Sequence, residues 1–339
     1  MSLRDPLLVD SLGRAITYLR ISVTDRCNLR CVYCMPPDAF AAGAAQHLPR
    51  AAILRYEEIA QVVRLAAQYG VRKVRLTGGE PLVRPDLPHL VRLLAAIPQI
   101  EEISLTTNGL LLEKMAPALQ AAGLKRVNIS LDTLQPEKFA RITRGGSFQA
   151  AWRGIEAAER AGLHPIKINV VAMRGVNDDE LPALARLSIT RGWDVRFIEL
   201  MPVSNQAAWG EGFPAPDAAY LPAPEILKML APLHLDPVAE HDSAGPAREF
   251  RAHGAAGRIG LITPLSEHFC QTCNRLRITA DGRFRPCLLH AEEIDFLTAL
   301  RSGQPLLEYL RRAVAAKPIG HELARRSAPE GRCMRQIGG

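Results

Sequence analysis

Short apolar segments alternate with segments of helical periodicity through the first two thirds of this chain of 339 residues. Such an alternation predicts a parallel sheet with right-handed crossovers and helices outside it. Gly70, Gly123 and Gly162 follow three of the helical segments, where helix C-termini are expected. We expect strands at 19–24, 72–77, 103–107, 126–131, 166–172 and 195–200, and helices at 56–69, 86–96, 113–122, 149–161 and 179–191.

The expected strands carry polar residues at every second position, as in Arg20 and Ser22 of the first and Asn128 and Ser130 of the fourth. Period two places these side chains on one face of the sheet, whereas a strand buried on both faces should be almost continuously apolar. Six strands are too few for a closed eight-stranded barrel. The sequence therefore predicts an α/β fold, an incomplete (β/α)6 TIM-like barrel with a polar lumen.

The overall composition argues against several classes of protein. The net charge of +7, from 42 basic and 35 acidic residues, comes without a long basic run, so nucleic acid is not an expected partner. No apolar run is long enough to span a membrane, and the N-terminus lacks the apolar core of a signal peptide. The seven cysteines fall into groups of three, three and one, unlike a disulfide framework. We expect a cytoplasmic protein without a membrane partner.

Several arginines stand singly inside the apolar strand segments, among them Arg20, Arg75 and Arg196. A buried guanidinium needs a compensating partner. A polyanionic ligand could supply one through charge-assisted hydrogen bonds, and a carboxylate ion pair is an equally good explanation for any one of them.

Three cysteines follow the first expected strand within eight residues, at Cys27, Cys31 and Cys34. This CxxxCxxC spacing can hold three of the four irons of a [4Fe-4S] cluster and leave the fourth iron open to a small molecule. A zinc knot or a disulfide is the alternative, although no good fourth zinc ligand stands nearby.

A second group, Cys270, Cys273 and Cys287, has the spacing CxxC-x13-C. With His290 it could form a closed, four-ligand structural zinc ribbon. Three cysteines on an iron–sulfur cluster would instead leave another open iron. The spacing by itself does not decide between them. Cys333 matches neither motif, and we expect it to be a core or incidental thiol.

The CxxxCxxC motif with Tyr33 before its last cysteine resembles that of the radical S-adenosylmethionine (SAM) superfamily. This resemblance implies that the open iron binds the amino and carboxylate groups of SAM, whose reductive cleavage gives methionine and a 5′-deoxyadenosyl radical. It also implies the incomplete barrel.

Three further features narrow the resemblance: the second cysteine group, the Asn-Arg-Leu-Arg segment 274–277, and the Gly-Gly end of 334–339. Together they resemble the GTP 3′,8-cyclase family of molybdenum cofactor biosynthesis (molybdenum cofactor biosynthesis protein A). The resemblance implies that the second group also holds a [4Fe-4S] cluster, against the guanine of GTP, and that the tail enters the active site.

The resemblance assigns ligands by position. The two clusters would be bound by Cys27, Cys31, Cys34, Cys270, Cys273 and Cys287. SAM would contact Tyr33, Gly79, Ser130 and Met201. GTP would contact Arg20, Arg75, Thr106, Lys167, Arg275, Leu276 and Arg277, with Leu276 offering its backbone. Arg275, Arg277, Gly338 and Gly339 would support catalysis. Arg196 is the weaker phosphate candidate, because it lies an odd number of positions from Glu199 and Met201. Its side chain is therefore expected on the opposite face of the strand from theirs.

The implied function is the radical SAM-dependent cyclisation of GTP to (8S)-3′,8-cyclo-7,8-dihydroguanosine 5′-triphosphate, a carbon–carbon lyase reaction. In it the radical abstracts hydrogen from ribose C3′, and the carbon radical attacks guanine C8. The implied partners are a flavodoxin- or ferredoxin-type reductant and the downstream cyclic pyranopterin monophosphate synthase, with the chain a monomer or homodimer.

Two alternatives are a radical SAM enzyme that modifies a peptide and uses an auxiliary cluster, and a zinc-ribbon or iron–sulfur module that only binds nucleotides. In every case we expect two regions in the chain. Residues 1–235 would form the radical SAM core, and 236–339 a C-terminal extension with the second cluster, GTP ligands and the tail.

Overall fold

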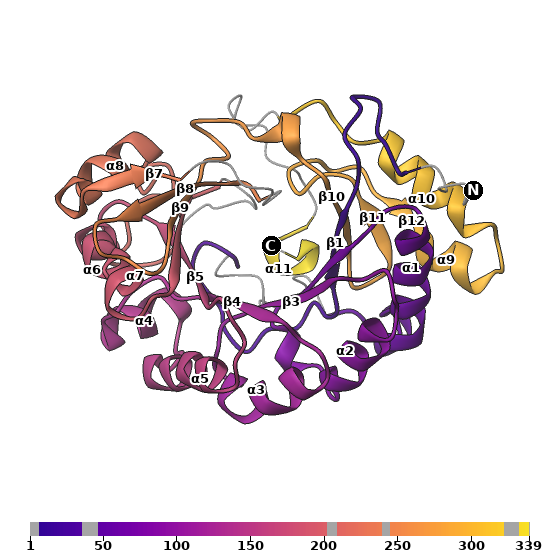
Figure 1. Cartoon of the computed structure of the whole chain (residues 1–339), viewed down its shortest axis with the longest axis horizontal. Helices are drawn as coiled ribbons and strands as arrows, with labels where there is room; N and C mark the ends of the chain where they lie inside the picture. The colour runs from indigo at the N-terminus through magenta and orange to yellow at the C-terminus, as the bar shows by residue number, and fades with distance from the viewer. Residues whose placement is uncertain (1–6, 36–46, 202–208, 239–244, 322–331, 339) are drawn as a thin grey trace.

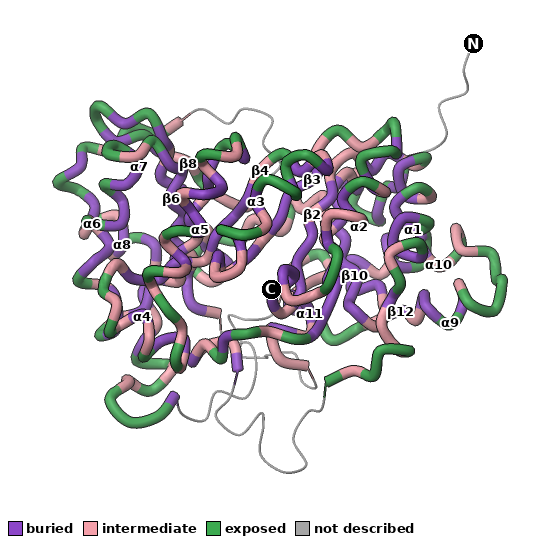
Figure 2. Tube along the Cα trace, turned by 90° about the horizontal axis from the view of Figure 1, so that it is seen from below, coloured by how far each residue is buried: buried purple, intermediate pink, exposed green. Residues whose placement is uncertain are grey.

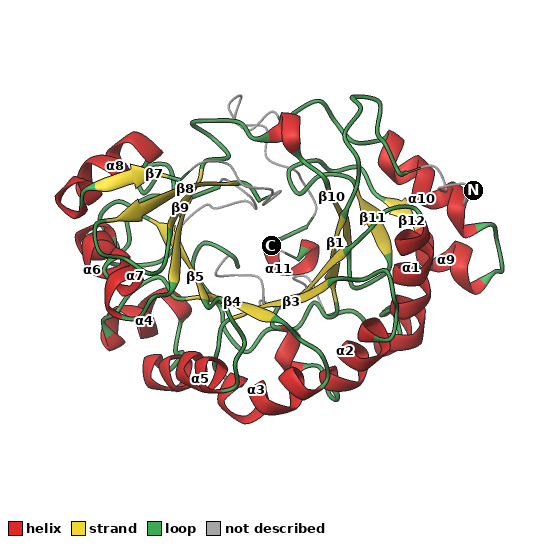
Figure 3. Ribbon diagram, viewed as in Figure 1, coloured by secondary structure: helices red, strands yellow, loops and turns green. Residues whose placement is uncertain are grey.

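The computed structural model describes residues 7–35, 47–201, 209–238, 245–321 and 332–338. Within them it forms one 12-stranded sheet with the strand order β12-β11-β10-β1-β2-β3-β4-β5-β6-β9-β8-β7. The sheet curves into an open horseshoe, strands inside and helices outside (Figures 1 and 3). The expectation of an α/β fold with an incomplete barrel is confirmed.

The strands are β1 (Tyr18–Ser22), β2 (Lys73–Thr77), β3 (Glu102–Thr107), β4 (Arg126–Ser130), β5 (Lys167–Ala172), β6 (Asp194–Glu199), β7 (Leu235–Pro237), β8 (Ala247–Ala252), β9 (Ile259–Ile262), β10 (Arg275–Ile278), β11 (Arg283–Arg285) and β12 (Ile294–Asp295). The helices are α1 (Tyr56–Gln68), α2 (Leu87–Ala95), α3 (Leu112–Ala121), α4 (Pro136–Thr143), α5 (Phe148–Arg160), α6 (Leu181–Ala185), α7 (Leu187–Thr190), α8 (Ala223–Leu230), α9 (Phe296–Arg301), α10 (Leu306–Ala315) and α11 (Met334–Ile337).

The strands β1 to β6 match the six expected from the sequence and pair in parallel. The helix expected at 179–191 is wrong as a single element, because the chain breaks it at Arg186 into α6 and α7. The helix α4 was not predicted, since eight residues give too few turns for a clear periodicity. A glycine with a positive φ of 101° ends the first helix at Gly70, as expected.

The C-terminal part of the chain adds strands at both edges of this six-stranded core. The strand β10 pairs in parallel with β1, and β9 pairs in parallel with β6. Residues far apart in the sequence therefore meet around one lumen. The domain boundary at 235/236 stays a prediction.

The main hydrophobic core lies between the sheet and its outer helices. Alternate strand residues such as Leu19, Ile21 and Leu76 are fully buried there. Figure 2 shows the strands mostly buried and exposed residues concentrated on the outer elements. The residues between them, such as Arg20, point to the other face, so the polar period-two pattern marks the lumen.

The C-terminal helix α11 lies inside the curve of the sheet rather than among the outer helices (Figure 1). It follows that the end of the chain helps to fill the lumen. In the described parts of the chain, no helix is long and apolar enough to cross a membrane.

Candidate functional site

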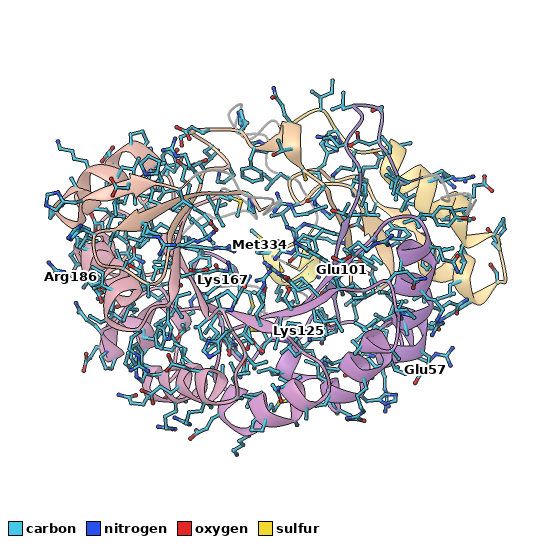
Figure 4. The ribbon with its side chains drawn as sticks, viewed as in Figure 1. Glu57, Glu101, Lys125, Lys167, Arg186 and Met334 are labelled. Carbon is cyan, nitrogen blue, oxygen red and sulfur yellow. The ribbon has the colours of Figure 1, made fainter. Side chains whose placement is uncertain are left out.

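The lumen contains a cavity of about 720 Å³, within the range of about 300–1,000 Å³ typical of small-molecule pockets. Its walls come from β1 to β6, from β10 and from the loops that carry the second cysteine group. Figure 4 shows Lys167 and Met334 toward the inside of the curve, and Glu57 and Arg186 on its outside. One chamber therefore collects residues from both ends of the sequence.

Strand register places three arginines side by side in this chamber. Arg20 on β1 is level with Arg75 on β2 and with Arg277 on β10, and all three line the cavity. In the described part of the chain, none of them has a carboxylate within 4.0 Å. Burial, reinforced by the neighbouring arginines, lowers the pKa of Arg20, and it lowers that of Arg277 to about 9. Of the two explanations for buried arginines, an anionic ligand fits this row.

A second set of cations in the cavity wall is paired. Lys167 Nζ lies 2.9 Å from Asp194, Arg126 lies 2.6 Å from Glu102, and Arg196 lies 3.5 Å from Glu249. Burial and the nearby Arg196 lower the pKa of Lys167 to about 8 despite its aspartate partner. These cations belong to the same chamber as the unpaired arginines.

Arg196 corrects the parity argument made from the sequence. It pairs in register with Asn169 of β5 and lines the cavity together with Lys167. Glu199 and Met201 line the cavity as well, so the comparison of parity with them does not exclude Arg196. Its place in the wall makes Arg196 as suitable a phosphate ligand as Lys167.

The first cysteine group forms a half-buried loop directly after β1. The amide of Cys34 donates to the carbonyl of Cys31 (3.0 Å), which closes a turn between the two thiols. Burial raises the pKa of Cys27 to about 11, and burial with the neighbouring thiols raises that of Cys34 further. Thiols that disfavour one another's ionisation need a cationic centre to bring them together as thiolates.

The Gly-Gly-Glu-Pro turn packs against this loop through its backbone. The amide of Gly79 donates to the carbonyl of Thr24 (2.8 Å), and a Cβ on Gly79 would lie only 2.3 Å from the carbonyl oxygen of Arg26. Only glycine permits this approach. Gly79 does not itself line the cavity, so its expected contact with SAM stays a prediction.

Other predicted SAM residues do line the cavity: Tyr33, Ser130 and Met201. The hydroxyl of Tyr33 donates to Asp132 (2.7 Å), a residue for which the sequence analysis assigned no role. Burial raises the pKa of Asp132 to about 6, against the stabilising hydrogen bonds from Val171 and Tyr33. A buried carboxylate at the carboxyl end of β4 can accept hydrogen bonds from a polar ligand.

The second cysteine group surrounds the opposite wall. Cys270 begins a 3-10 turn, η5 (Cys270–Thr272), Cys273 follows this turn, and Cys287 follows β11. All three line the cavity. Burial would raise the pKa of Cys273, but Arg275 and Lys317 outweigh it and lower the pKa to about 7.

Both cysteine triads fit the iron–sulfur clusters that the resemblance implies. Each triad supplies three unoxidised thiols, the ligand type that holds such clusters. Some residues that line the chamber carry buried polar atoms without a hydrogen-bond partner among the described residues, including Nε of Arg20, Oγ1 of Thr106 and Oδ1 of Asn274. Buried polar atoms are normally hydrogen-bonded, so these mark places for ligand atoms. Among the described residues, no three His, Cys, Asp or Glu side chains converge on a single metal ion.

The C-terminal tail reaches the row of arginines. Arg277 donates to the carbonyl oxygen of Gly338 (2.6 Å). Gly338 has a φ of +69°, and a Cβ there would lie 3.2 Å from the side chain of Thr77. Both the positive φ and this close contact favour glycine at the position. Gly339 lies outside the described residues. Gly338 therefore contacts a residue that lines the cavity, and the role of the tail in catalysis stays a prediction.

The predicted GTP residues divide into two groups. Those that line the cavity are Arg20, Arg75, Thr106, Lys167, Arg275 and Arg277. Leu276 lies on the opposite face of β10 and is buried in the core, so its side chain takes no part. The roles of all these residues stay predictions. The sequence analysis did not predict Lys73, which also lines the cavity. Lys73 stands two residues before Arg75, so the two side chains are expected on the same face of the strand, and this could have identified it.

Two family models match successive parts of the chain. The "Radical SAM superfamily" model matches residues 21–188, and the "Molybdenum Cofactor Synthesis C" model matches 193–323. Among solved structures, Streptococcus suis SuiB bound to S-adenosylmethionine superposes with a TM-score of 0.58 at 16% identity, over 80% of this chain and 60% of the SuiB chain. At that identity the likeness shows the fold alone.

Relatives with much higher identity cover nearly all of the chain. A GTP 3′,8-cyclase of Pelotomaculum thermopropionicum is 50% identical over 335 residues, which cover 97% of this chain and 99% of that protein. One of Moorella thermoacetica is 49% identical with the same coverage, and one of Listeria monocytogenes is 44% identical over 98% of this chain and 99% of its own. These matches establish that the chain belongs to the GTP 3′,8-cyclase family of radical SAM enzymes.

Proposed function

We propose that this chain is a GTP 3′,8-cyclase, which converts GTP to (8S)-3′,8-cyclo-7,8-dihydroguanosine 5′-triphosphate in the first step of molybdenum cofactor biosynthesis. The observation that carries the proposal is the chamber itself. It is lined by Tyr33 from the first cysteine loop, by all three cysteines of the second group, and by arginines that have no carboxylate partner in the described part of the chain. Such a chamber can hold two ligands facing each other.

The first triad, Cys27, Cys31 and Cys34, would hold one [4Fe-4S] cluster, and the second triad, Cys270, Cys273 and Cys287, the other. When bound, the first cluster with SAM supplies a 5′-deoxyadenosyl radical, and the second supplies an open iron for the substrate. The protein's contribution is to position SAM and GTP so that the reacting atoms meet.

Charge complementarity assigns the phosphate end of GTP. Arg20 and Arg75 are half-buried and have no carboxylate partner in the described part of the chain, and a triphosphate would compensate their charges. Lys167 and Arg196 can extend this cradle, since their carboxylate partners leave donor atoms free on each side chain. The Arg275–Arg277 end of the chamber then adjoins the guanine side.

The tail contributes by filling the open side of the lumen. With α11 inside the curve and Gly338 held by Arg277, less of the chamber is left to water. Exclusion of water protects radical intermediates from side reactions. We therefore propose Gly338 and Gly339 as supports of catalysis through closure of the site.

The same proposal includes the partners. Reduction of the first cluster calls for a flavodoxin- or ferredoxin-type protein, and the product would pass to a cyclic pyranopterin monophosphate synthase. We propose a monomer or homodimer in the cytoplasm, with the radical SAM core in residues 1–235 and the extension in 236–339.

The test is anaerobic turnover with SAM, a strong reductant and GTP deuterated at C3′, followed by mass spectrometry. Deuterium in 5′-deoxyadenosine is the expected result. If 5′-deoxyadenosine forms without deuterium, GTP is not the hydrogen donor, and a peptide substrate becomes the better explanation. Absence of 5′-deoxyadenosine from protein with about eight irons per chain would reject an enzymatic role and leave a nucleotide-binding module.

A further inference from the structure

Lys317 is a buried lysine beside the second cysteine group. It follows α10 and is 5% exposed. Its Nζ donates to the carbonyl oxygen of Arg275 (2.8 Å) and lies 3.4 Å from that of Pro286. The third neighbour of the ammonium is the Sγ of Cys273, at 3.6 Å. One side chain therefore touches both segments that carry the second triad.

Among the described residues, the ammonium of Lys317 has no carboxylate partner. In the part of the chain that the structure describes, no Asp or Glu lies within 4.0 Å of it, and the groups that act on its charge are Cys273, Arg14 and Cys287. A buried charge is costly unless an opposite charge compensates it. Carbonyl oxygens satisfy hydrogen bonds but bring no net charge. The thiolates of the second triad are the available counter-charge.

The position of Lys317 is fixed by a separate arginine. Arg14 donates from one nitrogen to the carbonyl of Cys270 (2.6 Å) and from another to that of Pro318 (2.8 Å), and Asp10 holds its Nε (2.6 Å). This clamp joins the residue after Lys317 to the first cysteine of the triad. The lysine is therefore held against the cysteine loop rather than free to swing away from it.

We propose that Lys317 is a positioning residue that holds the second cluster and raises its reduction potential. A hydrogen bond or a positive charge at a cluster sulfur stabilises the reduced state, which carries more negative charge. The inference rests on the proposed function, because it requires a cluster at Cys270, Cys273 and Cys287. No sequence motif had indicated a role for Lys317.

The test is a redox titration of the reconstituted two-cluster protein, monitored by electron paramagnetic resonance. Lys317→Met and Lys317→Gln remove the charge, and Lys317→Arg retains it. We expect the neutral variants to move the midpoint of the second cluster to more negative values, by the equivalent of tenfold harder reduction, about 59 mV for one electron. The first cluster should not move, and Lys317→Arg should stay near wild type. Lys228→Met, on the exposed face of α8, is the control that removes one charge elsewhere.

An unchanged second-cluster midpoint in a neutral variant that keeps its iron would overturn the inference. If both neutral variants lose the second cluster while Lys317→Arg keeps it, the charge requirement is supported by iron content alone. Loss of the cluster in all three variants would overturn it, since shape rather than charge would then be decisive. If wild-type protein assembles only about four irons, the proposed second cluster itself fails, which is a distinguishable result.

Discussion

The two cysteine triads provide the same three ligands in different electrostatic surroundings. At the first triad, burial and neighbouring thiols raise the pKa of Cys31 and Cys34, and burial raises that of Cys27 to about 11. At the second, burial also raises the pKa of Cys270, but Arg275 and Lys317 overcome burial at Cys273 and lower its pKa to about 7. Spacing alone would not have distinguished the two sites in this way.

The difference follows the ligands that each site is proposed to receive. SAM bears a sulfonium and is bound through its own amino and carboxylate groups, so the first loop needs few added cations. GTP is a polyanion, and two of the cations proposed to bind it, Arg275 and Arg277, also lie near thiols of the second triad. One set of residues can therefore attract the substrate and stabilise the thiolates beside it.

The largest expected effect is a difference in reaction products between variants of the first triad and variants of the second. Cys31→Ser should abolish 5′-deoxyadenosine formation, because SAM cleavage depends on the first cluster. Cys273→Ser should abolish cyclisation but keep a first cluster that cleaves SAM, with iron falling from about eight to about four per chain. Mass spectrometry of the nucleosides and iron analysis measure both. Equal loss of 5′-deoxyadenosine in the two variants would contradict a division of labour between the triads.

A smaller effect is expected in the row of unpaired arginines. Arg20→Met removes a half-buried charge that has no carboxylate partner in the described part of the chain. GTP should bind about 10- to 100-fold more weakly, as expected for losing a charge-assisted contact of about 1.5–3 kcal/mol. The ligand-free protein should melt at a higher temperature, since the cost of a poorly solvated charge without a counter-charge is gone.

Calorimetry measures the affinity of each protein for GTP, and thermal unfolding of the same preparations measures the melting temperature. Arg72→Met is the control, because Arg72 lies just before β2 and bonds to the carbonyls of Ala67 and Val71 rather than facing the chamber. A lower melting temperature for ligand-free Arg20→Met would show that Arg20 holds the fold instead of awaiting a ligand.

Sequence patterns predicted the elements whose signals are local. Period two in β1 to β6 identified the lumen face, and the cysteine spacings identified both triads. Lys317 could not be identified, because its burial depends on contacts with Arg275 and Pro286, 42 and 31 positions away. The pairing of β10 with β1 is also long-range, so the level alignment of Arg277 with Arg20 required the structure.

The tail offers a further test at the first triad. Arg335 is buried and donates to the backbone carbonyl of Asp25 (2.9 Å), two residues before Cys27. Arg335→Ala should loosen the tail and expose the first loop, with iron release to a chelator about tenfold faster for a lost contact of about 1.4 kcal/mol. The second cluster should release iron at the wild-type rate.

The comparison for this variant is Arg311→Ala, on the exposed side of α10. Hydrogen exchange of residues 334–338 should rise in Arg335→Ala alone. If iron leaves both clusters equally fast, the effect of Arg335 is global instability rather than support of the first loop.

The smallest expected effect is a proton linked to GTP binding. The pKa of Lys167 is lowered to about 8 by burial and by Arg196, so part of the free protein lacks this positive charge above pH 8. A phosphate beside Lys167 would favour the ammonium and raise its pKa on binding. Binding must then take up protons at pH 8.5, and the affinity for GTP must fall as pH rises through 8, by at most tenfold per unit.

Calorimetry at pH 8.5 in buffers of different ionisation enthalpy measures the proton uptake directly. Lys167→Arg keeps the positive charge but does not titrate in this range, so its uptake should be smaller and its affinity less dependent on pH. Identical proton uptake in the two proteins would place the titrating group elsewhere and remove Lys167 from the phosphate cradle. A reduced uptake would support Lys167 of β5 as part of the phosphate cradle.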